Sequence, residues 1–195
     1  MPAEDANRWN LRYQTDPRNL SDHPRNLILE HANLLPPHGL ALDIAMGLGG
    51  NTKFLLQHGL CVIGVDISYV AVSRAKHELP TLMGVVADLQ HFHIPHNTFD
   101  VILNFLYLQR NLWEPFIYGL KIGGVLFMEC LTEDMLSIHP EINPTYLLKP
   151  AELQHAFIND EVGKTMEILF YNEGWCSTTT SHPRATASLI ARRIA

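Results

Sequence analysis

Three short apolar runs each end in residues that could bind a ligand. The first passes through Asp43 into the glycine-rich turn 46–51, the second ends at Asp66 and the third at Asp88. A glycine-rich turn that opens a helix presents backbone N–H groups to a ligand. Asp66 is placed to accept both hydroxyls of a ribose, and Asp88 to accept from an exocyclic adenine amine. Because the runs repeat at about 22-residue intervals, we expect neighbouring strands whose carboxyl ends form one crevice.

The order of acid and glycines separates this turn from other nucleotide-binding turns. It reads Asp-x-Ala-x-Gly-x-Gly from Asp43 to Gly49, unlike the Gly-x-Gly-x-x-Gly of dinucleotide enzymes. An acid at position 43 favours a cationic ligand group and would repel a pyrophosphate. A lone aspartate at a strand end is commonly a helix cap or a solvated surface group. The joint spacing of the three acids and the turn favours the ligand crevice instead.

The hydrophobic pattern predicts an alternating α/β chain with an antiparallel pair at its end. The expected strands are 40–45, 61–65, 83–87, 100–104 and 124–131, of which the first four are parallel, followed by 166–171 and 187–194. The expected helices are 52–58, 68–78, 108–120 and 151–157, with Ser68 as an N-cap.

Two segments stand apart from this alternation within one expected domain, 1–195. Residues 1–35 precede the first strand and are expected to form a helix and irregular chain that cover the core, 36–195. Residues 132–150 contain three prolines and little periodicity. A connection of that length after a strand that borders the crevice is typical of a lid or substrate loop.

The composition of the chain limits the classes of partner that we expect it to bind. The net charge of −6 gives no basic field for nucleic acid, and no apolar run is long enough to span a membrane. The N-terminus carries acids where a secretory signal has basic and apolar residues, so we expect a cytoplasmic location. Cys61, Cys130 and Cys176 are expected to be small buried hydrophobes in a reducing compartment.

These motifs resemble those of class I S-adenosylmethionine-dependent methyltransferases over nearly the whole chain. The matching stretches are 42–50, 65–68, 87–89, 99–102 and 120–124. The resemblance implies a Rossmann-like fold, which is a doubly wound, mostly parallel seven-stranded sheet with an antiparallel edge pair at the C-terminus. It also implies S-adenosyl-L-methionine as the cofactor. The implied cofactor-binding residues are Asp43, Ala45, Met46, Gly47, Gly49, Asn51, Asp66, Ile67, Asp88, Leu89 and Asn104.

The chain departs from this family at Ala45, where the family usually has its first glycine. The added methyl group narrows the approach to the methionine part of the cofactor. Within the family, the stretches 8–13, 107–110 and 143–150 are similar to bacterial small-molecule methyltransferases of the tellurite-resistance and thiopurine type.

Methyl transfer from a sulfonium needs alignment and exclusion of water, so no catalytic side chain is obligatory. The acceptor is expected at the tips of the fourth and fifth strands, as a small polar or anionic molecule. Whether it presents oxygen, nitrogen, sulfur or a metalloid stays open. The acceptor-side candidates are Tyr13, Asn104, Tyr107, Arg110 and Glu129, with Trp9 and Arg12 as possible covers. For Tyr107 a place in the core, and for Arg110 a pair with a surface acid, are equally open.

Other chemistries find less support. The loop histidines His91, His93 and His96 are expected to be exposed and not to bind a metal. No nucleophile turn or phosphate-binding lysine is present, which disfavours hydrolases and nucleoside triphosphatases. Two alternatives stay open, a non-catalytic S-adenosylmethionine sensor and a nicotinamide-dependent oxidoreductase. The departure at Ala45 is compatible with the sensor, and Asp43 argues against the oxidoreductase.

Overall fold

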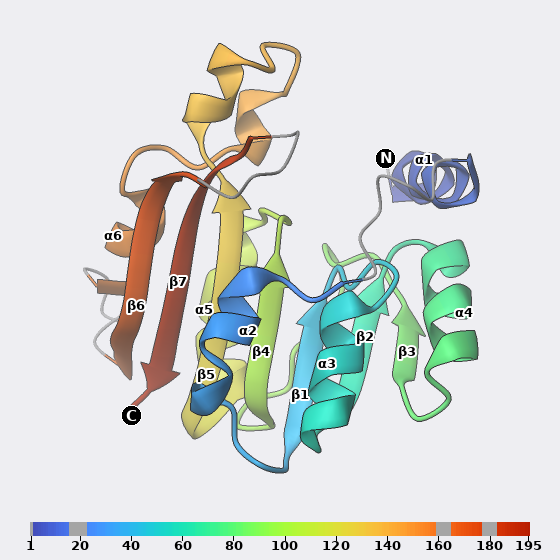
Figure 1. The fold of residues 1–195 in the computed structure, drawn as a ribbon, viewed down its shortest axis with the longest axis vertical. Coiled ribbons are helices and arrows are strands. Elements are labelled where there is room, and N and C mark those ends of the chain that lie inside the picture. Colours follow the sequence, from blue (N-terminus) through green and yellow to red (C-terminus); the bar gives the residue numbers. More distant parts are fainter. Residues whose placement is uncertain (1, 16–22, 159–164, 177–182) are drawn as a thin grey trace.

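A seven-stranded sheet forms the centre of the protein, seen here in a computed structural model that describes residues 2–15, 23–158, 165–176 and 183–195. Its strand order is β3-β2-β1-β4-β5-β7-β6 (Figure 1). Strands β1 to β5 run parallel, and β7 lies antiparallel between β5 and β6. The strands are β1 Leu40–Ile44, β2 Cys61–Asp66, β3 Met83–Val86, β4 Phe99–Phe105, β5 Leu120–Leu131, β6 Met166–Trp175 and β7 Ala185–Arg193. The predicted fold class, with its antiparallel C-terminal pair, is confirmed.

Helices cover both faces of this sheet because its strands are apolar on both sides. Ala41 of β1 packs in a cluster with residues of α2, α3 and α4, whereas its neighbour Leu42 packs with residues of α5 and α6 on the other face. The helices are α1 Pro2–Thr15, α2 Asn26–Glu30, α3 Gly50–His58, α4 Tyr69–Glu78, α5 Trp113–Gly119 and α6 Glu152–Ile158. The 3-10 turns are η2 Ala32–Leu34, η3 Arg110–Leu112, η4 Glu133–Ser137 and η5 Pro144–Tyr146.

Several boundaries differ from the sequence prediction. The helix expected over 108–120 begins only at Trp113, preceded by η3. Pro115 explains this, because its ring would clash with the carbonyl of Asn111 in a continuous helix. Ser68 is the N-cap of α4 as predicted, since its hydroxyl accepts from the N–H of Ala71 at 3.2 Å.

The segment 132–150 is more regular than its prolines predicted. It contains η4 and η5, and Met135 and Leu147 are buried there in a small apolar cluster with Ala185 of β7. Figure 1 shows this segment beyond the carboxyl end of β5, at the end of the sheet where α1 also lies.

The cysteine prediction is correct for one residue and wrong for two. Only Cys130 is buried, whereas Cys61 and Cys176 are exposed. Cys61 begins β2 at the edge of the core, and Cys176 follows the last residue of β6. In the described part of the chain, no helix has the length and apolar character needed to cross a bilayer.

Candidate functional site

The glycine turn after β1 is built from left-handed backbone. Ala45, Gly47 and Gly49 have φ values of 51°, 56° and 80°. Gly49 is the N-cap of α3, so the turn leads directly into a helix N-terminus. Glycine adopts this conformation freely, whereas alanine is strained in it. The departure of Ala45 from the family pattern therefore has a backbone cost as well as an added methyl group.

Asp43 lies beneath the turn. Its side chain is buried, and its Oδ2 accepts from the hydroxyl of Thr52 at 2.7 Å. Burial raises the pKa of Asp43 to about 7, against the opposing effect of the Thr52 hydrogen bond. Asp43 therefore supports the turn from below and titrates near neutral pH, where a nearby cation would favour its charged form.

Asp66 ties the turn to the end of β2. Its Oδ2 accepts from the N–H of Gly47 at 2.9 Å and its Oδ1 from the N–H of Ser68 at 2.8 Å. Burial raises the pKa of Asp66, opposed by these backbone hydrogen bonds. Each carboxylate oxygen has a second lone pair, so ribose hydroxyls could add to these contacts without replacing them.

Among the described residues, one buried carboxylate oxygen and one buried amide oxygen lack a hydrogen-bond partner at the tips of β3 and β4, the strands on either side of the β1–β2 pair. They are Oδ2 of Asp88, after β3, and Oδ1 of Asn104, near the end of β4. The other atoms of both side chains are engaged, because Asp88 Oδ1 accepts from Gln90 N–H at 3.0 Å and Asn104 Nδ2 donates to the Tyr107 carbonyl at 2.9 Å. Buried acceptors without donors cost free energy, so this arrangement suits a ligand that brings N–H groups.

Helix α1 lies over the turn and is fixed by contacts with α4. Asn10 Oδ1 accepts from the Ser68 hydroxyl at 2.8 Å and from the Val70 N–H at 3.2 Å, and Arg74 donates to the Tyr13 carbonyl at 2.8 Å. Tyr13 is buried against Gly47, and burial, followed by the charge of Asp66, raises its pKa. Tyr13 was predicted on the acceptor side, but the structure places it on the glycine turn.

Arg25 joins the glycine-turn helix to the tip of β5. Its backbone N–H donates to Asn51 Oδ1 at 2.9 Å, and its Nε donates to Glu129 Oε1 at 3.1 Å. Ser188 of β7 donates to the other Glu129 oxygen at 3.2 Å. Burial and the nearby charge of Arg25 lower the pKa of Arg184, so a second guanidinium lies in this region. Sequence reasoning missed Arg25, Arg184 and Ser188, because no motif marks them.

Tyr107 stands between the acids of the crevice. Its hydroxyl is hydrogen-bonded to Gln109, whose Nε2 donates to the Leu89 carbonyl at 3.3 Å. Burial, followed by the charges of Asp88, Asp5, Asp66 and Tyr146, raises the pKa of Tyr107 to about 12. Tyr107 is thus a neutral wall residue near the predicted cofactor side.

Arg110 does not face an open acceptor site. Its guanidinium is paired with both carboxylate oxygens of Glu152 and donates to the carbonyls of Thr145 and Leu147 at 3.1 and 3.0 Å. The pair with an acid, one of the two alternatives for Arg110, is therefore observed, and its role toward an acceptor stays a prediction.

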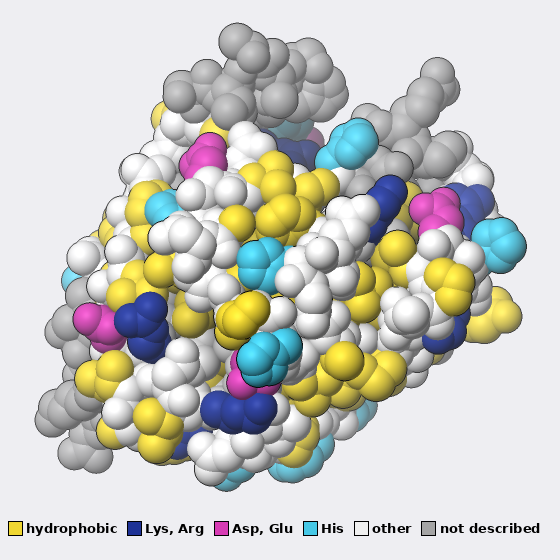
Figure 2. All heavy atoms as spheres, turned by 60° about the horizontal axis from the view of Figure 1, so that its bottom comes forward, with side chains coloured by type: hydrophobic (Ala, Val, Ile, Leu, Met, Phe, Trp, Pro, Cys, Tyr) yellow, Lys and Arg dark blue, Asp and Glu magenta, His cyan; other side chains and the backbone are white. Residues whose placement is uncertain are grey.

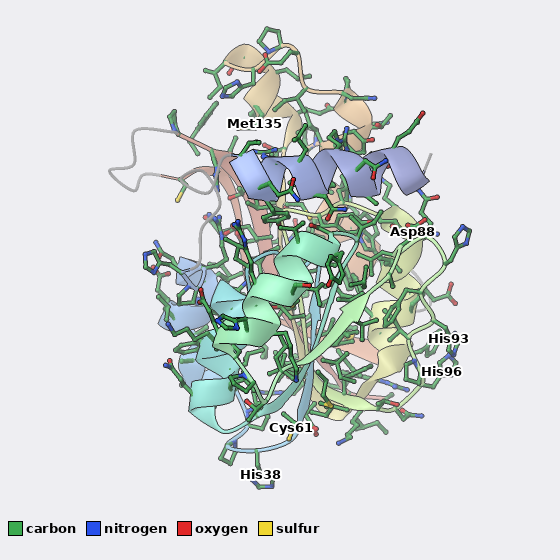
Figure 3. The ribbon with its side chains drawn as sticks, turned by 90° about the vertical axis from the view of Figure 1, so that its right-hand side faces the viewer. His38, Cys61, Asp88, His93, His96 and Met135 are labelled. Carbon is green, nitrogen blue, oxygen red and sulfur yellow. The ribbon has the colours of Figure 1, made fainter. Side chains whose placement is uncertain are left out.

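The remaining predicted residues complete the floor and walls. Met46 and Leu89 are buried, and Ile67 is half-buried between Asp66 and Ser68. Among the described residues, no three His, Cys, Asp or Glu side chains are grouped to hold a metal ion. His96 stacks on Tyr118 at 5.4 Å between ring centroids, and Figure 3 shows His93 and His96 on the loop beyond Asp88.

A hollow of about 260 Å³ lies at the other end of the sheet, beside Leu35, Ile122 and Arg192. Figure 2 turns this end toward the viewer and shows hydrophobic side chains there among charged ones. Asp100, its acidic lining residue, is engaged by Lys121 and by the N–H of Leu40, both at 2.8 Å. The orphan acceptors and the glycine turn lie at the carboxyl end instead, which makes that end the candidate site.

The sequence of residues 41–119 matches a family model described as a methyltransferase domain. The matched range runs from β1 through α5, and so includes the glycine turn, Asp66 and Asp88. This match identifies the range 41–119 as similar in sequence to methyltransferase domains. No curated protein sequence matches the chain.

Solved structures agree with its fold. An S-adenosylmethionine-dependent methyltransferase from Methanosarcina mazei superposes with a TM-score of 0.69 at 16% identity, covering 88% of this chain and 99% of that one. TehB from Haemophilus influenzae gives a TM-score of 0.70 at 17% identity over 93% of this chain and 66% of its own. Geranyl diphosphate C-methyltransferase from Streptomyces coelicolor gives 0.62 at 14% identity over 86% and 78%. At these identities the likeness establishes the fold alone.

The residues of the crevice fit S-adenosylmethionine, the cofactor that the sequence motifs predict. Asp88 Oδ2 and Asn104 Oδ1 are buried acceptors without donors, and the cofactor carries an adenine amine and an ammonium group as donors. The acid-rich setting, with Asp43 and Asp66 at the turn, also suits a cofactor that carries positive charge. When bound, the cofactor supplies the activated methyl group together with its leaving group.

Proposed function

We propose that the chain is an S-adenosylmethionine-dependent methyltransferase that acts on a small-molecule acceptor by direct displacement. The observation that carries the proposal is the covering of the crevice from two sides. Helix α1 lies over the glycine turn through Tyr13, and the packed segment 132–150 lies at the tip of β5 (Figure 1). A crevice closed in this way admits a small molecule and excludes water from the reacting atoms.

In this proposal the chain contributes binding and orientation. Asp43, Gly47, Gly49, Asp66 and Asp88 bind the cofactor, with Ala45, Met46, Asn51, Ile67, Leu89 and Asn104 beside them. Alignment of the acceptor lone pair with the bond to the transferred methyl group supplies most of the acceleration, so no general base is required.

The acceptor side is defined by Arg25, Arg184, Glu129 and Ser188. Two guanidiniums and one carboxylate leave an excess of positive charge there, whereas the cofactor side carries three aspartates. We therefore propose a polar or anionic acceptor, oriented by the planar fork of an arginine. The geranyl diphosphate C-methyltransferase of the same fold was solved with geranyl diphosphate, which is a small anionic molecule.

Calorimetric titration with S-adenosylmethionine, S-adenosylhomocysteine and NAD tests the cofactor. An acceptor screen that follows S-adenosylhomocysteine release then compares small thiols, phenols and oxyanions with tRNA, DNA and protein. We expect transfer to at least one small molecule and to none of the macromolecules. Transfer to a macromolecule alone would overturn the acceptor assignment, and tight cofactor binding without any transfer would favour the sensor alternative.

A further inference from the structure

Helix α1 is held on the protein by polar contacts and not by the hydrophobic core. Its partly or fully buried residues recur at intervals of three and four, so they form one stripe along the helix, which consists of Asp5, Ala6, Trp9, Asn10 and Tyr13. In the described part of the chain, no residue of α1 belongs to any of the three apolar clusters. A segment with few apolar contacts opens at a low free-energy cost. The hydrogen bonds of α1 to other elements therefore decide whether it stays in place.

Asn10 joins α1 to the beginning of α4. Its Oδ1 accepts from the Ser68 hydroxyl at 2.8 Å and from the Val70 N–H at 3.2 Å. Ser68 is the N-cap of α4, and Val70 lies in the first turn, where backbone N–H groups lack partners within the helix. Asn10 therefore satisfies one of these N–H groups from a different helix, while the Ser68 hydroxyl accepts from the Ala71 N–H at 3.2 Å.

Ser68 connects this contact to Asp66, the predicted ribose acceptor. The Ser68 N–H donates to Asp66 Oδ1 at 2.8 Å, while its hydroxyl donates to Asn10. The other Asp66 oxygen accepts from the Gly47 N–H at 2.9 Å, and Gly47 lies against the Tyr13 hydroxyl. Figure 3 shows α1 lying across this end of the molecule, next to α4. Two routes of direct contact therefore lead from Asp66 to the inner face of α1.

We propose that α1 is a lid over the bound cofactor and that Asn10 is the positioning residue that docks it. The lid closes on the connection after β2, and its opening limits the release of the cofactor. This inference rests on the cofactor of the proposed function and deepens it, because it assigns the N-terminal helix to the control of that site. Asn10 acts through Ser68 and touches neither the reacting atoms nor the acceptor.

A chemically matched amide elsewhere in the chain separates this role from ordinary surface stabilisation. Asn143 Oδ1 also accepts from one backbone N–H and one hydroxyl, both of Thr145, at 3.0 and 2.9 Å. Asn143 is the N-cap of η5, so both hydrogen bonds stay within one turn. Asn143→Ala therefore removes the same pair of hydrogen bonds without touching α1.

The first test is hydrogen exchange on the full chain without ligand. Helix α1 has 14 residues, and a helix of that length is marginal in water once it is undocked, so exchange of its amides reports docking. Asn10→Ala should accelerate this exchange about 10-fold, and because alanine is the better helix former, lower helix propensity cannot be the cause. Asn10→Asp retains an acceptor oxygen and should stay within about 2-fold of the parent. Equal exchange in the parent and Asn10→Ala, or equal acceleration by Asn143→Ala or Asn10→Asp, would overturn the docking role of Asn10.

The second test measures the binding rates of radiolabelled S-adenosylhomocysteine, with an excess of unlabelled ligand added to follow release. Asn10→Ala should raise the dissociation rate constant about 10-fold without lowering the association rate constant, because an open lid obstructs neither exit nor entry. Lys76→Ala is the control, since it removes hydrogen bonds to the Pro80 and Leu82 carbonyls at the far end of α4 and should leave both rate constants unchanged. A lowered association rate constant in Asn10→Ala, or equal acceleration of release by Lys76→Ala, would overturn the lid.

The parent chain distinguishes a failure of the lid from a failure of the proposed function. If the parent binds S-adenosylhomocysteine and Asn10→Ala releases it at the parent rate, the lid alone is wrong. If the parent binds neither S-adenosylhomocysteine nor S-adenosylmethionine, the proposed function and the lid fail together, while hydrogen exchange still decides whether Asn10 docks α1.

Discussion

The hydroxyl of Tyr13 lies 2.7 Å from the position that a Cβ atom would occupy on Gly47. A residue of the N-terminal helix thus packs directly on the turn predicted to cradle the cofactor. Gly47 is required twice, once for its φ of 56° and once for the space that Tyr13 fills. We therefore expect cofactor binding and the position of α1 to be coupled through this contact.

Gly47→Ala should weaken S-adenosylhomocysteine binding by at least about 10-fold, because the new methyl group displaces Tyr13 and strains the turn. Calorimetric titration measures this loss, and Trp9 fluorescence reports movement of α1. Gly123→Ala is the control, since Gly123 has a φ of 85° with no atom within 4 Å of a Cβ. Equal affinity losses in the two variants would show that Tyr13 plays no part.

Ala45→Gly should raise stability by up to about 1 kcal/mol and bind S-adenosylhomocysteine at least as well as the parent. Ala45 has a φ of 51°, which glycine adopts without strain, although glycine also gains entropy in the unfolded chain. Urea unfolding and titration measure the two effects. A large loss of affinity would reveal a specific contact of the Ala45 methyl group.

The positions of the strand ends at the crevice were predictable, because each apolar run ends in an acid or a glycine and this pattern depends on local sequence alone. The role of Ser68 as the N-cap of α4 was predictable for the same reason. The partner of Arg110 was not predictable, because Glu152 lies 42 residues away in a stretch without periodicity. The late start of α5 follows from Pro115, because a proline ring disrupts the preceding turn of a helix.

The free energy of unfolding of Asp43→Asn, taken relative to that of the parent, should increase as the pH rises from 5 to 8. Burial raises the pKa of Asp43 to about 7, so the folded chain holds a proton that the unfolded chain releases above about pH 4. The contribution of Asp43 to stability therefore falls between these two pKa values as the pH increases. Asparagine retains an oxygen for Thr52 and does not ionise.

Urea unfolding at pH 5 and pH 8 measures this difference, which we expect to reach at least about 1 kcal/mol. Asp100→Asn is the control, because partial burial of Asp100 is outweighed by its hydrogen bonds and by the charge of Lys121, which lower its pKa, so its titration lies below this window. A pH-independent difference for Asp43→Asn would show that Asp43 is ionised throughout.

Asp66→Ala should weaken S-adenosylhomocysteine binding by about 1 to 3 kcal/mol. The variant loses the predicted ribose acceptor and also frees the N–H groups of Gly47 and Ser68, which Asp66 holds at 2.9 and 2.8 Å. Titration measures the affinity, and circular dichroism checks the fold. Asp66→Asn retains one acceptor oxygen, so its affinity for S-adenosylhomocysteine should lie between those of the parent and of Asp66→Ala. Normal binding by a folded Asp66→Ala variant would remove Asp66 from the cofactor site.

Arg25→Ala should lower the free energy of unfolding by about 1 to 3 kcal/mol, because it leaves the Glu129 carboxylate without its cation. The Glu129 side chain is only 12% exposed and would retain the Ser188 hydroxyl as its partner. Glu129→Gln in the same chain removes the uncompensated charge, so the double variant should recover part of the loss. Arg192→Ala is the control, since its pair with Glu167 at 3.5 Å is open to solvent and contributes little.

Arg25→Ala also distinguishes effects on the cofactor side of the crevice from effects on the acceptor side. The Arg25 backbone N–H still donates to Asn51 in Arg25→Ala, so the glycine-turn helix and S-adenosylhomocysteine affinity should be preserved. The charge excess at the acceptor side is lost, so the rate with an anionic acceptor should fall more than the rate with a neutral thiol. Rates measured on both acceptors at saturating S-adenosylmethionine provide the comparison. An equal fall on both would show that Arg25 supports the fold of this region and has no preference for acceptor charge.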